Sequence, residues 1–257
     1  MNRLLHADGI RMIRSKWFWL CLGSMLVMAS AFIIMQYTAM DYVVPLSRVI
    51  FLPLSFYGMI TAAFVSLFAG QDFTDGFIRN KLIAGRGRHN VFFSNLIVSF
   101  IACIIIYLIT VLFTVLIGSI FFEVDVTAER YLQYMFLGVG MCLAYVSIYC
   151  TITMLCRKGT TAIVLCMGLS FFLLFLGLYT NQIMVQPEYK DGIPNPAYVE
   201  GAVKSFYAIL HDLNPTGQAA QLSAMDVFSP FRWLICDFVW ILAAGAGSIL
   251  FRHTDIK

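Results

Sequence analysis

The chain has 257 residues, of which 60% are hydrophobic and 12% are charged, and its formal net charge is +3. Soluble domains carry about 45–50% apolar and about 25% charged residues, so this composition excludes an ordinary soluble fold. The length is sufficient for several membrane-spanning segments.

Six long apolar runs are nearly free of charge, and each is close to or longer than the roughly 20 residues that a membrane-spanning helix needs. They predict spans at about 17–36, 50–69, 93–121, 132–155, 160–183 and 233–251. None of the runs alternates with a period of two, which argues against a membrane barrel. We therefore predict an all-α integral membrane protein in which residues 1–257 form a single transmembrane domain.

The positive charges predict the orientation of these spans. With the N-terminus in the cytoplasm, the outer connections hold most of the acidic residues, and the positive-inside rule favours this topology with both termini cytoplasmic. Twelve of the 17 Lys and Arg residues then lie on the cytoplasmic side, namely Arg3, Arg11, Arg14, Lys16, Arg79, Lys81, Arg86, Arg88, Arg157, Lys158, Arg252 and Lys257.

No catalytic or metal-binding pattern is recognisable. The seven cysteines form no CxxC pair and the four histidines lie far apart, so we expect no metal site. The phosphate-binding pattern G-x-x-x-x-G-K-[ST] does not occur, so we expect the chain neither to hydrolyse ATP nor to bind a cofactor by itself. H-E-x-x-H and G-x-S-x-G are also missing, which weakens the case for a membrane enzyme.

Residues 1–16 combine positive charges with apolar residues. This stretch either lies along the inner headgroups as an interfacial helix or only supplies the positive flank of the first span. Its residues of interest are Arg3, Arg11, Arg14 and Lys16, set among Leu4, Leu5, Ile10, Met12 and Ile13.

The expected cytoplasmic connection, residues 70–90, is the most informative part outside the spans. It opens with acidic Asp72 and Asp75 and continues into basic Arg79 and Lys81. Acids at the start and bases at the end match the dipole of a short helix. Such a helix between two spans is suited to docking a partner.

Thr74 or Asp75 is the predicted N-cap of this short helix, because their side chains accept hydrogen bonds from free backbone N–H groups. The apolar residues of the segment either pack on the inner ends of neighbouring spans or meet a protein partner. They are Phe73, Phe77, Ile78 and Leu82.

The longest outer connection, residues 186–232, predicts two short amphipathic helices, Ala197 to Leu213 and Gln218 to Phe228, separated by Asn214-Pro-Thr-Gly217. They either cap or line what the spans enclose, dip into the bilayer, or form a lid that only shields loops. The apolar face of the first is expected to contain Val199, Val203, Phe206, Leu210 and Leu213.

The last span contains one charged residue, Asp237. Ionisable groups inside membranes often serve function. Asp237 therefore either faces a water-filled outer cavity on a transport pathway, or caps the helix start or pairs with Arg232. In the same span, Gly245 and Gly247 are expected to allow close approach of a neighbouring helix.

The run Gly70-Gln-Asp-Phe-Thr-Asp-Gly-Phe-Ile-Arg-Asn-Lys-Leu82 resembles the cytoplasmic loop of type-2 ABC exporter permeases from Gram-positive bacteria, of the lantibiotic-immunity and multidrug-like kind. The basic turn Gly85-Arg-Gly-Arg88, the run Asn214-Pro-Thr-Gly-Gln218 and the ending Phe251-Arg-His-Thr-Asp-Ile-Lys257 extend the resemblance over nearly the whole chain. Phe77 stands where the family often has Thr.

The resemblance implies a bacterial plasma-membrane permease that works with a second, identical or homologous permease and with separate ABC ATPase subunits, which hold ATP and magnesium. The loop would be the coupling helix in a cleft of the ATPase, and the outer helices would close the pathway. The coupling residues carried over are Asp72, Phe73, Asp75, Gly76, Phe77, Ile78, Arg79, Asn80, Lys81 and Leu82.

The implied function is export of an amphipathic peptide or lipophilic compound, as in antimicrobial peptide resistance. The alternatives are a subunit for lipid or ion export, a membrane sensor or scaffold, and a membrane enzyme. The expected partners are ABC ATPases, a second permease and membrane lipids, with no nucleic acid.

Overall fold

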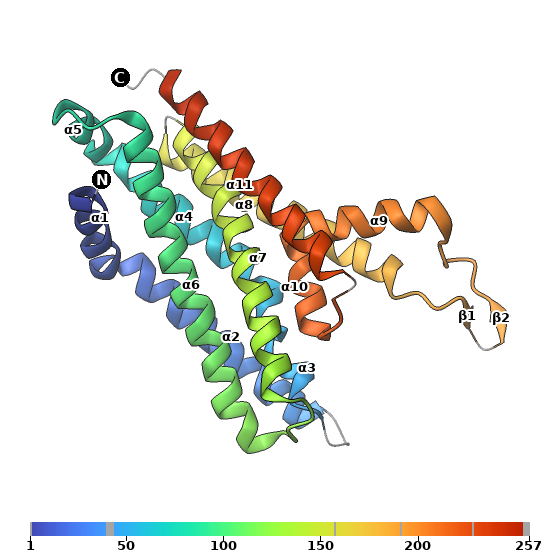
Figure 1. Cartoon of the computed structure of the whole chain (residues 1–257). Coiled ribbons are helices and arrows are strands. Elements are labelled where there is room, and N and C mark those ends of the chain that lie inside the picture. The colour runs from blue at the N-terminus through green and yellow to red at the C-terminus, as the bar shows by residue number, and fades with distance from the viewer. Residues whose placement is uncertain (1, 40–43, 157, 191, 228, 254–257) are drawn as a thin grey trace.

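The molecule is a bundle of long helices (Figure 1). The computed structural model describes residues 2–39, 44–156, 158–190, 192–227 and 229–253. Within these residues six helical segments are long and apolar enough to cross a membrane, which confirms the predicted all-α class and its six spans. They are α2 (Lys16–Ala39), the composite segment Ser47–Thr74, α6 (Arg88–Phe121), α7 (Ala128–Leu155), α8 (Gly159–Met184) and α11 (Pro230–His253).

The second span is built from three pieces, whereas the sequence predicted one helix over 50–69. It consists of α3 (Ser47–Ile50), the 3₁₀ helix η1 (Leu52–Phe56) and α4 (Tyr57–Thr74). Pro53 lies at the start of η1 and has no N–H to donate, so a regular α-helical ladder cannot run through this point.

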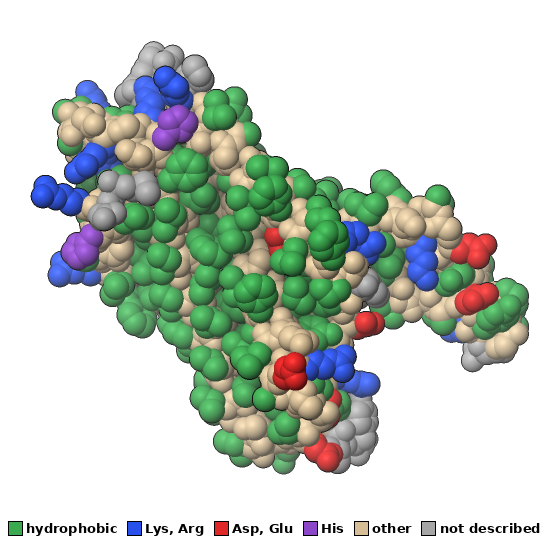
Figure 2. All heavy atoms as spheres, viewed as in Figure 1, with side chains coloured by type: hydrophobic (Ala, Val, Ile, Leu, Met, Phe, Trp, Pro, Cys, Tyr) green, Lys and Arg blue, Asp and Glu red, His purple; other side chains and the backbone are tan. Residues whose placement is uncertain are grey.

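Large apolar side chains are exposed along the spans, and Figure 2 shows such side chains covering much of one face of the bundle. In water this surface would be unfavourable, whereas acyl chains solvate it. The protein is therefore a multi-pass membrane protein. Examples of the exposed side chains are Leu20, Val27 and Ile34 in α2, Leu116 and Ile120 in α6, Val164, Phe172 and Phe175 in α8, and Phe238, Leu242 and Ile249 in α11.

The centre of the bundle is filled by tyrosines. The ring of Tyr57 in α4 lies edge-on to Tyr107 in α6 and Tyr145 in α7, with centroid distances of 6.2 and 6.0 Å. The Tyr57 hydroxyl donates to the Cys103 carbonyl oxygen at 2.8 Å, and the Tyr145 hydroxyl lies 2.8 Å from the Thr216 hydroxyl. These hydrogen bonds satisfy polar atoms that the bilayer could not hydrate.

Helix α11 packs closely on α7 at one of its two predicted glycines. A Cβ on Gly247 would collide with the Thr151 side chain, whereas a Cβ on Gly245 would meet nothing within 4 Å. The expectation of close approach is confirmed for Gly247 and wrong for Gly245, because Gly245 lies on another side of the helix.

The predicted helices of the 186–232 segment are present with shifted bounds. After a small hairpin of β1 (Tyr189–Lys190) and β2 (Ile193–Pro194), the chain forms α9 (Gly201–Leu213) and α10 (Pro215–Ala224). Asn214 separates the two helices and caps α10 by accepting from Thr216 N at 3.0 Å. The end of the predicted second run, Phe228, lies outside the described residues.

Helix α9 is largely exposed, whereas helix α10 is buried. Helix α9 extends sideways from the bundle with the hairpin, and its expected apolar face is largely uncovered, with Val203 and Phe206 exposed (Figure 1). Its buried positions are instead Ala208, His211 and Asp212. Helix α10 is almost entirely buried against α7, α8 and η1, so it belongs to the core.

Both ends of the described chain lie at the same end of the bundle (Figure 1). We call this the basic end, formed by α1 (Asn2–Arg14), α5 (Phe77–Ile83), the first turn of α6 and the last turn of α11. Arg88 Nη1 in α6 donates to the Arg252 carbonyl oxygen of α11 at 2.9 Å there. That the basic end faces the cytoplasm stays a prediction.

Gly247→Ala should destabilise the bundle by about 1–3 kcal/mol, because the added methyl group overpacks the contact with Thr151. Gly245→Ala is the matched control in the same helix and should be neutral or slightly stabilising, because alanine is the better helix former. Thermal unfolding of both variants in detergent micelles checks this. Equal effects of the two substitutions would contradict the packing described.

Candidate functional site

The predicted coupling segment, residues 72–82, lies at the basic end and is divided between two helices. Helix α4 continues to Thr74, and α5 begins at Phe77. Between them Gly76 has a φ of 69°, a left-handed conformation that favours glycine.

The predicted cap of the short helix is wrong. Gly76 is the residue that precedes α5, and it has no side chain to accept a hydrogen bond. Thr74 is still part of α4, where its hydroxyl donates to the Gly70 carbonyl oxygen at 3.3 Å, and Asp75 follows the last turn of α4. A tight glycine turn, rather than side-chain capping, therefore sets the start of α5.

One face of this segment points into the bundle. Asp72 has no exposed surface and Ile78 is 1% exposed. Phe73 and Leu82 are partly buried against the core, and Lys81 is also partly buried. For these apolar residues packing on the spans is the correct alternative, and they offer little surface to a partner.

The other face is exposed. Phe77 is 43% exposed, and Ile83, which the sequence analysis did not single out, is 74% exposed. Asp75, Arg79 and Asn80 are exposed beside them. The segment and the adjoining Ile83 thus present both apolar and polar side chains outward at the basic end.

A buried network of ion pairs anchors this exposed face. Asp72 forms ion pairs with Arg11 of α1 and, at 3.2 Å, with Lys81 of α5. Lys81 Nζ also donates to Asp8 of α1 at 2.8 Å, and Ser94 of α6 donates to the second Asp8 oxygen at 2.7 Å. Four elements, α1, α4, α5 and α6, are therefore joined through side-chain contacts.

The pKa values of the two basic residues in this network depend on the acidic residues around them. Burial lowers the pKa of Lys81 below its ordinary value, and the hydrogen bond and charge of Asp8 oppose that shift. Burial also lowers the pKa of Arg11, with Asp8 and Asp75 opposing. Removing a carboxylate would leave a buried cation without compensation, which is costly.

Sequence reasoning missed Asp8, Arg11 and Ser94 as partners of the segment. A signal was present in α1, where Leu4, Asp8 and Met12 follow one another at the four-residue spacing of one helix face and are all buried. A carboxylate within an apolar helix face indicates a buried cation nearby.

A second polar cluster lies in the other half of the bundle, where α9, α10 and α11 meet. Asp212 forms an ion pair with Arg232 and accepts from Gln221 Nε2 at 2.7 Å. Gln218 Nε2 donates to Asp237 Oδ1 and to the Asp212 carbonyl oxygen, both at 2.9 Å. The cluster holds the buried helix α10 between its neighbours.

The expected partner of Asp237 is therefore wrong. Arg232 pairs with Asp212, and Asp237 lies in the second turn of α11, which begins at Pro230, so it does not cap the helix. Asp237 is 4% exposed and packs so closely on α7 that a Cβ on Gly140 would collide with its carboxylate. A role in a transport pathway stays a prediction.

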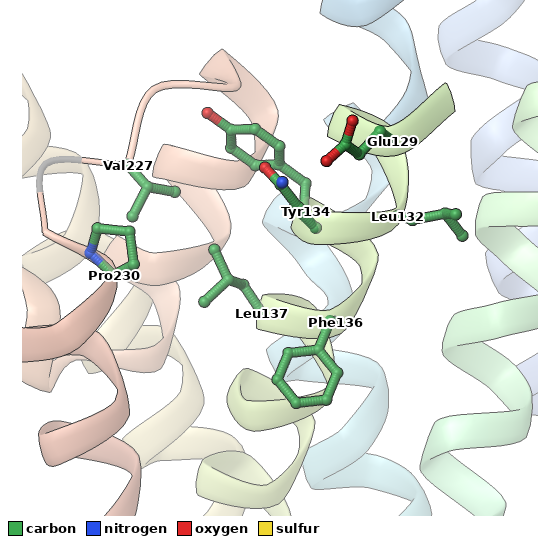
Figure 3. A pocket seen from close by; sticks show the side chains of 8 residues that line it. Glu129, Leu132, Tyr134, Phe136, Leu137, Val227 and Pro230 are labelled. Carbon is green, nitrogen blue, oxygen red and sulfur yellow. The ribbon is translucent and has the colours of Figure 1, made fainter. Parts of the chain in front are cut away.

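An apolar pocket of about 590 Å³ opens beside α7. Figure 3 shows side chains of α7 facing Val227, which follows α10, and Pro230, which begins α11. Leu132 and Phe136 are exposed on the lipid-facing surface, and Glu129 supplies a carboxylate at the pocket. The full lining is Glu129, Leu132, Gln133, Tyr134, Phe136, Leu137, Val227 and Pro230.

Six spans with an anchored short helix at one end define a multi-pass helical membrane protein. The model of the ABC-2 family transporter proteins matches residues 10–177, well over half of the chain, and the protein belongs to this family. It is thus a membrane permease component of an ABC transporter rather than its ATPase. The comparison with curated proteins finds no match.

Asp8→Asn should destabilise the basic end by about 3 kcal/mol, because Lys81 loses its closest carboxylate while remaining partly buried. Glu188→Gln, which likewise removes a carboxylate charge but at an exposed position beside the hairpin and away from this network, should cost less than about 0.5 kcal/mol. Thermal unfolding in detergent micelles compares the two. Similar losses for both variants would show that the network contributes little.

Gly140→Ala should cost about 1–3 kcal/mol, because its methyl group would occupy the space of the Asp237 carboxylate. In an Asp237→Ala background the same change should cost much less, because that space is free. A double-mutant cycle of unfolding free energies measures this coupling. Additive costs would mean that the two positions do not compete for space.

Proposed function

We propose that this protein is the permease subunit of an ATP-driven exporter, and that α5 is the element through which separate ATPase subunits drive it. ABC-2 permeases normally work with ATPase subunits, so a partner of this kind accords with the family. The substrate proposed is an amphipathic peptide or another lipophilic compound, moved out of the cell or the membrane.

The main support for the coupling role is the exposed face of α5. Phe77 and Ile83 expose apolar surface beside the charges of Asp75 and Arg79. Apolar side chains next to charges are typical of a protein contact, in which the apolar part is buried and the charges select the partner. A cleft of the ATPase that accepts α5 would need apolar residues at its base and, around them, charges opposite to those of Asp75 and Arg79.

The anchoring of α5 supports the same role. A docked ATPase can move the spans only if the docking element does not bend away under load. Lys81 joins α5 to both Asp8 of α1 and Asp72 of α4, so a displacement of α5 acts on these helices as well. The ion-pair network is thus the mechanical connection of the proposed mechanism.

The packing of the bundle supports the proposal that the protein pairs with a second permease. Buried rings such as Tyr57, Tyr107 and Tyr145 fill the space between α4, α6 and α7. In the proposed mechanism the pathway for a large substrate lies between two permease copies rather than through this packed interior. The apolar pocket beside α7 adds a lipid-accessible surface on which a lipophilic compound would first bind.

Arg79→Glu should reduce both binding and activation of the ATPase by about tenfold or more, because it reverses a charge on the docking face. The test uses the full chain expressed with a candidate Walker-motif ATPase from the same organism. Co-purification measures binding, and hydrolysis in proteoliposomes measures coupling.

Lys190→Glu is the matched control, since it makes the same charge reversal in the exposed hairpin away from α5. It should leave ATPase binding and hydrolysis at the level of the unsubstituted protein. Both variants should insert into the membrane normally. Full ATPase binding by Arg79→Glu would overturn α5 as the docking element. If no ATPase binds the unchanged chain, the exporter proposal itself is wrong and a sensor or scaffold takes its place.

A further inference from the structure

A cavity of about 500 Å³ lies at the basic end, where α1, α2 and α4 meet. None of its lining residues belongs to α5, although Arg11 also lies 5.9 Å from the centre of the Phe77 ring, and the proposed function does not use the cavity. Its lining combines three cations with apolar rings and chains, namely Arg11, Arg14, Ser15, Lys16, Trp17, Leu20, Phe68 and Gln71.

The positive charge of this cavity is not balanced by the protein. Arg11 is compensated, because it pairs with Asp72 and its guanidinium lies 4.2 Å from the centre of the Phe68 ring. Among the described residues, however, neither Arg14 nor Lys16 forms an ion pair, and both are exposed. Two uncompensated cations therefore border one cavity and attract an anion.

Besides the cations and the polar residues Ser15 and Gln71, the lining is apolar. Trp17 and Leu20 come from the first turns of α2, and Phe68 comes from α4. Leu20 is 61% exposed on the outer surface of the bundle, so this side of the cavity continues onto the lipid-facing surface of α2. The cavity thus has a cationic part and an adjoining apolar part, the pattern that suits an amphiphile.

The cavity lies at the level of the membrane interface. Lys16 is the first residue of the spanning helix α2, and the apolar run begins directly after it. Trp19 is exposed, and its ring N–H donates to the Ile13 carbonyl oxygen at 2.8 Å. Tryptophan together with Lys and Arg is typical of the headgroup region at the end of a span.

We propose that this cavity binds an anionic phospholipid, with its phosphate between Arg14 and Lys16 and an acyl chain along Leu20 and Phe68. A soluble phosphate compound would share the ionic contact but would leave the apolar part unused. A bilayer lipid reaches both parts without leaving its leaflet. Because α1 also carries Asp8 and Arg11 of the ion-pair network, the bound lipid would hold the helix that anchors α5.

The experiment measures lipid binding to the purified full chain in detergent micelles, by native mass spectrometry and by thermal unfolding. The probes are phosphatidylglycerol, phosphatidylcholine, and glycerol 3-phosphate as a soluble headgroup. Phosphatidylglycerol should bind and stabilise, phosphatidylcholine should bind more weakly, and glycerol 3-phosphate should have no effect at equal concentration. Stabilisation by glycerol 3-phosphate equal to that by phosphatidylglycerol would overturn the lipid assignment in favour of a soluble-anion site.

The variant Arg14→Gln with Lys16→Gln should weaken phosphatidylglycerol binding about fivefold for each charge removed. The control Arg3→Gln with Arg86→Gln removes the same charge from exposed positions at the basic end that do not line the cavity. If phosphatidylglycerol binding is weakened equally in both double variants, the cavity is not the binding site, and the lipid responds only to the overall positive charge of the basic end. If the first double variant fails to fold, the single variants Arg14→Lys, expected to bind normally, and Arg14→Gln decide the question.

A protein occupant is the remaining alternative. If the cavity is covered by the ATPase, a purified permease–ATPase complex should no longer retain phosphatidylglycerol, and that result would overturn the proposal. Retention of the lipid in the complex supports it. Because lipid binding is measured on the permease alone as well, the outcome does not depend on whether the exporter function is correct.

Discussion

Asp72 carries a negative charge at the end of a membrane-spanning helix with no surface exposed to solvent. An isolated carboxylate in that position would cost several kcal/mol, and it is tolerated because Arg11 and Lys81 bring positive charge to it from two other helices. Asp8 completes the network by pairing with Lys81, so two acids face two bases. The positions of α1 and α5 at the basic end both depend on this neutralisation.

The same constraint organises the other half of the bundle. Asp212 is neutralised by Arg232, and Asp237 accepts a hydrogen bond from Gln218 of the buried helix α10. Burying a short helix among spans requires its backbone and side chains to find partners there, because lipid offers none. Asn214 supplies the first of them by capping α10.

Two neighbouring features of the basic end have different roles in the proposed exporter. At the basic end, the network leaves α5 with one anchored face and one exposed face, which carries Phe77 and Arg79 outward for an ATPase. Next to it lies the cavity bordered by Arg14 and Lys16, the proposed lipid site, on the helix that shares the network. The membrane and the ATPase would therefore act on the same anchored unit.

The sequence by itself determined the six spans, the basic segment before the first of them and the short helix after the second, because hydropathy and charge act over contiguous residues. It also placed Asp75 and Arg79 in that short segment, where both are exposed, whereas their docking role stays a prediction. Only the tertiary structure decided that Asp72 and Ile78 of that segment face inward and that Arg232 pairs with Asp212 rather than Asp237. Those choices depend on which helices pack together, and such contacts join residues too far apart in the chain for local pattern to specify.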